Sequence, residues 1–214
     1  MPEKIVATNE NIGELIGMAV IEYGPNCDLS HIDVSNVTDM NSLFAFSDFN
    51  GDISKWDVSN VRDMCNMFTK SEFDGDISNW NVSNVILMNN MFSYSEFEGD
   101  ISKWNVSNVR DMGEMFCGAL FNSDISRWDV SRVENMCGMF CNSFFNGDIS
   151  QWDPYFVISM SGMFYGSKFA GDICGWDVSP AVHKEIMFTN SALEKMGKLP
   201  PWYKEEIIPW NLLK

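Results

Sequence analysis

The chain carries few of the side chains that usually perform catalysis. It has two histidines, His31 and His183, and neither stands in a motif with a Ser or Cys nucleophile. No glycine-rich phosphate loop and no His-Glu metal motif occurs in the sequence. We therefore expect no catalytic residues and a protein that is not an enzyme.

Six cysteines could in principle bind zinc or pair as disulfides; they are Cys27, Cys65, Cys117, Cys137, Cys141 and Cys174. Cys117 and Cys141 are 24 residues apart with Cys137 close by, so a site of three thiolates is conceivable. However, the sequence has no C-x-x-C pair and no evident fourth ligand, and the irregular spacing argues against a disulfide ladder. We expect free thiols, no metal and no cofactor.

An aspartate also recurs at a fixed interval, as Asp52, Asp76, Asp100, Asp124, Asp148 and Asp172. Stacked carboxylates could hold calcium, but the nine-residue calcium-binding repeat is absent. Turn aspartates commonly accept nearby backbone N–H groups. The sequence favours this turn role, and calcium binding is the alternative.

One short motif near the C-terminus has two interpretations. Pro200-Pro201-Trp202-Tyr203 fits the P-P-x-Y pattern that WW domains bind as a polyproline helix. A buried cap at the end of the fold explains the same aromatic residues and is the favoured interpretation.

These residues belong to a strict internal repeat of 24 residues, marked by Trp56, Trp80, Trp104, Trp128, Trp152 and Trp176. Counting back from Trp56 reaches Ile32 in a further copy, so seven copies fill residues 28–191. Phenylalanines and methionines recur in the same register. Such columns indicate core positions, because one copy alone cannot bury its apolar face and stacked copies can.

Each copy predicts a strand, a short helix and a turn. Residues 53–58 have the spacing of a leucine-rich strand, and residues 61–68 place apolar side chains on one helical face. Gly75-Asp76 then turns the chain into the next copy. The predicted fold class is an α/β repeat solenoid, a stack of seven strand–short helix units with capped ends.

The repeated sequence FNGDISKWDVSNV, as in residues 49–61, resembles the BspA-like leucine-rich-repeat family. The resemblance implies a right-handed parallel solenoid with leucine-rich-repeat curvature. Relatives of this family are often secreted or lipid-anchored surface proteins that bind other proteins. A surface adhesin is therefore one alternative function.

The ends of the stack need caps. Residues 9–23 show helical spacing of apolar side chains, with Gly24-Pro25 as the stop signal. We expect an N-terminal capping helix within residues 1–27 and a C-terminal cap over residues 192–214.

The composition limits the class of partner and the location. With 14 Lys and Arg against 30 Asp and Glu, the net charge is −16 and the isoelectric point about 4.3. This balance disfavours binding to nucleic acid or to an anionic membrane. No membrane span or signal peptide is visible, so we expect a cytoplasmic protein.

Two surfaces could bind a partner protein. On the outward, concave side of the predicted strands lie two polar columns: Lys55, Asn79, Lys103, Arg127 and Gln151, and beside them Asp57, Asn81, Asn105, Asp129 and Asp153. A second, apolar patch would comprise Leu120, Phe144, Tyr155, Phe156 and Tyr165.

We expect a protein-binding module that uses the polar columns, with Arg127 as the best single anchor. The alternative is an acidic neutraliser, such as an immunity protein or nucleic-acid mimic, that occludes a basic partner. Self-association through the apolar patch is a further alternative.

Overall fold

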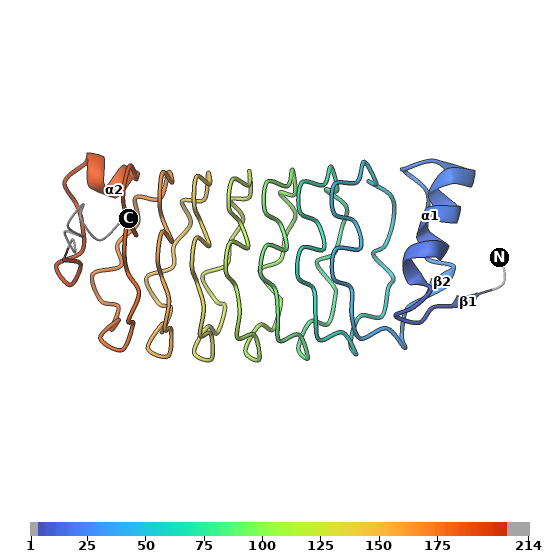
Figure 1. The fold of residues 1–214 in the computed structure, drawn as a ribbon, viewed down its shortest axis with the longest axis horizontal. Helices are drawn as coiled ribbons and strands as arrows, with labels where there is room; N and C mark the ends of the chain where they lie inside the picture. Colours follow the sequence, from blue (N-terminus) through green and yellow to red (C-terminus); the bar gives the residue numbers. More distant parts are fainter. Residues whose placement is uncertain (1–3, 205–214) are drawn as a thin grey trace, which may run out of the picture.

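A computed structural model describes residues 4–204 of the chain. Its helices and strands in that range are β1 (Ile5–Val6), α1 (Ile12–Tyr23), β2 (Ile32–Asp33) and α2 (Ala192–Lys195). Between β2 and α2 the chain runs in successive coils that lie side by side, with α1 and α2 at opposite ends of the stack (Figure 1). The protein is a repeat domain with little regular secondary structure.

The predicted repeat is present as columns of stacked, buried aromatic rings. The rings of Trp80 and Trp104 are nearly parallel, with centroids 6.5 Å apart and planes 3° apart. Phe92 and Phe116 stack in a second column at 5.8 Å, and a third phenylalanine column runs beside it. The methionines of the repeat are buried against these rings. These columns are therefore core, as the repeat register predicts.

Backbone hydrogen bonds join neighbouring coils in a parallel register. The bridges link residues 24 positions apart in the order Asp39, Asp63, Leu87, Asp111, Asn135, Ser159 and His183. From Met64 to Lys70, every second N–H donates to a carbonyl of the next coil, at 2.8 to 3.0 Å. The intervening N–H groups of Met67 and Thr69 donate to the carbonyl three residues earlier in the same coil.

The predicted strand and short helix within each copy are wrong. Residues 53–58 contain a turn and no strand, and residues 61–68 contain one bridge residue followed by turns. The reason is the backbone conformation of Asn66 and Lys70, whose φ values are +57° and +52°. A left-handed residue cannot continue a right-handed helix, and here it directs alternate N–H groups to the next coil. Positive φ recurs at these two positions in the other coils.

The predicted N-terminal helix is present as α1, and it begins at Ile12. Ile12, Ile16 and Ala19 are buried, and Gly24 ends the helix with a φ of +85°. An element that the sequence did not predict precedes α1: β1 pairs in parallel with β2, with Ile5 opposite Ile32.

At the other end, α2 and the residues after it pack on the last coil. Leu193 is buried at the position that phenylalanine occupies in the repeats. The indole N–H of Trp202 donates to the carbonyl of Ile173 at 3.0 Å, and Tyr203 packs edge-on against Phe188. The aromatic residues of the P-P-x-Y motif therefore pack on the core, while residues 205–214 of the predicted cap lie outside the described residues.

Candidate binding surfaces

The first predicted column lies on the surface, at turns instead of on strands. All five of its side chains are exposed: Lys55, Asn79, Lys103, Arg127 and Gln151. Each is positioned by a buried Ile two residues before it and a buried Trp one residue after it. Within residues 4–204, the side chains of Lys55, Lys103 and Arg127 form no hydrogen bond and no ion pair. We call these five residues the polar column.

The neighbouring column has a structural role. Its members Asp57, Asn81, Asn105, Asp129 and Asp153 are exposed. Each side-chain oxygen accepts the backbone N–H two residues later, at 3.0 to 3.2 Å. The hydroxyl and the N–H of Ser59 both bond to Asp57 and lower the pKa of that carboxyl. These oxygens stabilise turns, so they offer less to a partner than their exposure suggests.

The recurring aspartates from Asp52 to Asp172 confirm the predicted turn role. Asp52 accepts the N–H of Ser54 at 2.9 Å, and the equivalent bond recurs in the five later copies. Hydrogen bonds from Ser54 lower the pKa of Asp52. Across the described residues, no group of three or more His, Cys, Asp or Glu side chains could hold a metal ion.

The residues of the predicted apolar patch form two groups. Leu120 and Phe144 are exposed on adjacent coils, where the Phe144 N–H donates to the carbonyl before Leu120. Tyr155 and Phe156 are also exposed and meet edge to face, with centroids 5.3 Å apart. No ring contact or hydrogen bond in the described part of the chain links the two groups, and Tyr165 is only partly exposed.

A cation between two aromatic rings is a surface feature that the sequence analysis missed. The ammonium group of Lys70 lies 5.3 Å from the ring centroid of Phe46 and 5.7 Å from that of Tyr94. The three residues are 24 positions apart and lie on adjacent coils. Aligning the copies at this interval would have revealed the cation between two aromatic residues.

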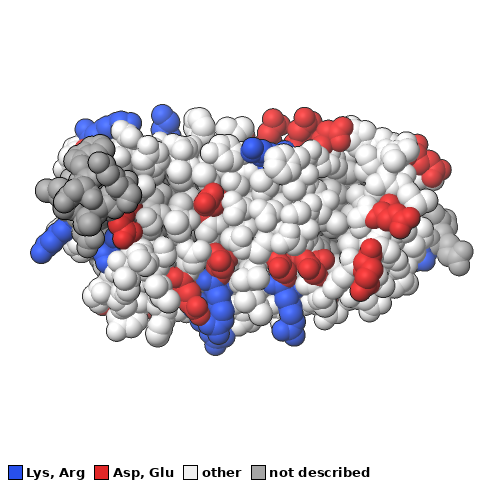
Figure 2. Space-filling model, viewed as in Figure 1, with Lys and Arg blue, Asp and Glu red and all other residues white. Residues whose placement is uncertain are grey.

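Charge is distributed unevenly over the visible face. Figure 2 shows small groups of acidic and basic side chains separated by uncharged surface. Arg110 and Glu134 form an ion pair between neighbouring coils. No helix in the described range is long and apolar enough to cross a membrane.

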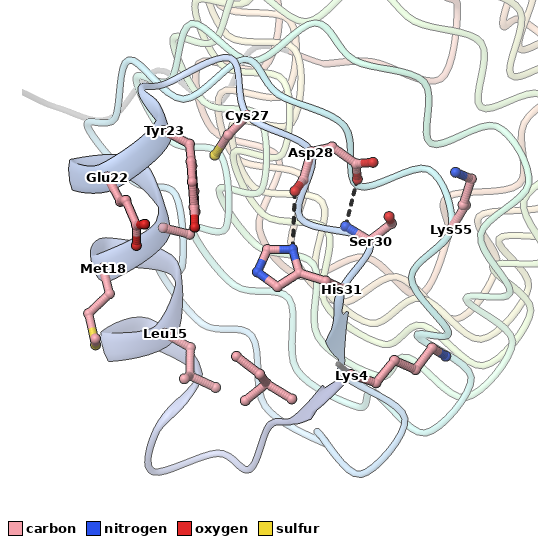
Figure 3. A pocket seen from close by; sticks show the side chains of 12 residues that line it. Lys4, Leu15, Met18, Glu22, Tyr23, Cys27, Asp28, Ser30, His31 and Lys55 are labelled. Carbon is pink, nitrogen blue, oxygen red and sulfur yellow. Dashed lines mark hydrogen bonds between the residues drawn. The ribbon is translucent and has the colours of Figure 1, made fainter. Parts of the chain in front are cut away.

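A cavity of about 880 Å³ lies between α1 and the first coil (Figure 3). It is lined by Lys4, Ile5, Leu15, Met18, Ala19, Glu22, Tyr23, Cys27, Asp28, Ser30, His31 and Lys55. Asp28 accepts the Ser30 N–H at 2.7 Å through its side chain, and its carbonyl oxygen lies 3.2 Å from Nδ1 of His31. The sequence did not predict this cavity, because its lining residues come from separate segments of the chain and meet only where α1 packs on the first coil.

The stacked coils define a repeat protein, and comparison with family models assigns its family. Residues 18–119 and 93–202 match a family described as Mycoplasma protein of unknown function, DUF285. These matches span most of the chain, which therefore belongs to the DUF285 family. No curated protein and no solved structure matches the chain.

Proposed function

We propose that this chain is a non-enzymatic module that binds another protein through the polar column. The observation that carries the proposal is the contrast within each copy. The buried Ile and Trp are repeated, whereas the exposed residue between them changes from Lys to Asn, Arg or Gln. Core packing does not constrain these side chains, and the lysines and arginine among them form no hydrogen bond and no ion pair in the described part of the chain.

The chemistry of the polar column suits an acidic or polar protein surface. Lys103 and Arg127 stand on adjacent coils and place two long cationic side chains side by side in an otherwise acidic protein. Arg127 is the proposed anchor, because a guanidinium group donates several hydrogen bonds in a fixed geometry.

The proposal also assigns the stacked coils to a more specific fold. We propose that the coils form a right-handed solenoid related to leucine-rich repeats. The parallel bridges at 24-residue intervals and the stacked Trp and Phe columns support it.

The experiment is capture of partner proteins from the lysate of the source organism at low and high salt. The baits are wild type, Lys103→Glu/Arg127→Glu, and Lys168→Glu/Lys198→Glu as a control with the same charge change at other exposed positions. The proposal expects a protein retained at high salt by wild type and by the control, and lost with the first variant. Retention by all three baits would overturn it.

The acidic charge supports a second candidate function, neutralisation of a basic partner. The exposed aspartates of the repeat are ionised at neutral pH, because the ordinary pKa of aspartate lies well below 7 and hydrogen bonds lower it further at Asp52, Asp76 and Asp100. A basic protein captured only at low salt, and equally well by all three baits, would favour this function.

A further inference from the structure

We propose that the cavity between α1 and the first coil binds a monocarboxylate with a long apolar tail. The site is separate from the proposed protein-binding function, although Lys55 belongs to both surfaces. Its volume of about 880 Å³ lies within the range of small-molecule sites.

One side of the cavity is an apolar wall. Leu15, Met18 and Tyr23 of α1 line it (Figure 3). Ile5 of β1 belongs to the same lining. Met18 and Tyr23 are 60 % and 63 % exposed, which is unusual for large side chains facing a concave site. An apolar tail laid against this wall would remove their surface from water, which favours binding.

The opposite side carries two cations, whose charges act on Asp33 and Asp52. Lys4 and Lys55 lie across the cavity from α1 (Figure 3), and neither forms a hydrogen bond or an ion pair within residues 4–204. The hydroxyl of Ser30 beside them makes no hydrogen bond in the same range. Each of these groups is a donor that a carboxylate head group can use.

The acidic groups of the cavity are already engaged. The Tyr23 hydroxyl bonds to Glu22, and this contact raises the pKa of Tyr23. Asp28 accepts the Ser30 N–H. His31 lies close to Asp28, and Cys27 is the remaining titratable group in the lining. The lysines are therefore the charged groups of the lining that form no hydrogen bond within residues 4–204.

A bare inorganic anion does not fit this arrangement well, because it would leave the apolar wall exposed. An apolar cation would be repelled wherever its charge lay near Lys4 or Lys55, and Glu22 and Asp28 are the lining carboxylates that it would have to reach instead. A ligand that combines an anionic head with an apolar body can contact both the lysines and the apolar wall.

The test uses dodecanoate below its micellar concentration, titrated into the full chain by isothermal calorimetry. Acetate has the same head group without the tail, and dodecyltrimethylammonium has the same tail with opposite charge. We expect saturable binding of one dodecanoate per chain and no binding of the other two probes. Equal binding of the cationic probe would overturn the proposal.

Matched variants locate the site. Met18→Glu puts a carboxylate on the apolar wall and should abolish binding, whereas Ile21→Glu, on the same helix and 88 % exposed outside the cavity, should leave it unchanged. Lys55→Gln should weaken binding roughly threefold to tenfold, and Lys103→Gln, in the same column but away from the cavity, should not.

Equal losses in Met18→Glu and Ile21→Glu would contradict the assigned site. The Lys103→Glu/Arg127→Glu variant separates the two proposals, because it should lose the protein partner and keep dodecanoate. Circular dichroism of each variant verifies that the coils remain folded.

Discussion

The indole N–H of Trp104 donates a hydrogen bond to the backbone carbonyl of Ile77 in the preceding coil, at 3.1 Å. The same bond, over the same separation of 27 residues, joins each repeat tryptophan to the coil before it. It satisfies a buried donor and a buried carbonyl together. Neighbouring coils are thus joined both by a tryptophan side chain and by backbone hydrogen bonds.

Removing one of these indole donors should destabilise the stack. Trp104→Phe loses the bond to Ile77, whose carbonyl keeps the bond from the Trp80 N–H, and it removes ring volume from a buried position. We expect a loss of roughly 2 to 4 kcal/mol in the free energy of unfolding, measured by urea denaturation with circular dichroism. The exposed neighbour variant Lys103→Gln should stay within about 0.5 kcal/mol of wild type. A similar change in both variants would show that the bond contributes little.

Two glycines should respond to alanine in opposite directions. A Cβ at Gly75 would lie 2.7 Å from the ring of Phe73, which is fully buried. Gly75→Ala should therefore cost about 1 to 3 kcal/mol. At Gly17 in α1 a Cβ would meet nothing within 4 Å, so Gly17→Ala should add about 0.5 to 1 kcal/mol. Thermal unfolding of both variants compares them directly, and a stabilising Gly75→Ala would contradict the packing described here.

The turn aspartates should make stability depend on acid pH. Hydrogen bonds from the Ser two residues later lower the folded pKa of Asp76 and Asp100 below the ordinary value of 3.8. A lowered folded pKa gives stability that is present above the unfolded pKa and lost as pH falls through the folded value. The melting temperature should therefore be constant near neutral pH and fall below about pH 4.

Asparagine provides the control for this acid dependence, because Asn105 already accepts the N–H of Ser107 in an equivalent turn. Asp76→Asn/Asp100→Asn should keep both turns and show a smaller fall in melting temperature between pH 5 and pH 3. An unchanged pH profile would assign the acid sensitivity to other groups.

The cysteines should differ widely in reactivity. Burial raises the pKa of Cys65 to about 12, so this thiol is protonated and shielded at pH 8. The hydrogen bond with Asp172 raises the pKa of Cys174, but its thiol is exposed. Iodoacetamide followed by peptide mass spectrometry should find Cys174 modified well before Cys65. All six thiols should react in denaturant, and early modification of Cys65 in native protein would contradict its burial.

Sequence reasoning was most successful where a residue's role is local or periodic. Trp80 and Phe92 recur at a constant interval because every coil excludes water from the same positions, so their burial was predictable. The turn role of Asp52 was predictable because its partner, Ser54, is two residues away. The strand and helix assignments failed because Asn66 and Lys70 adopt positive φ, which residues other than glycine rarely do.

The sequence by itself determined the repeat length, the core columns and the aspartate turns, since each follows from contacts that recur at a fixed spacing. Only the tertiary structure decided which N–H groups pair between coils and where the N-terminal cap leaves a cavity. Met18 and Lys55 line that cavity from different segments, and their approach depends on how α1 packs on the first coil. Periodicity reports which side chains avoid water, whereas the distance between two nonrepeating segments is set by the packing of the whole chain.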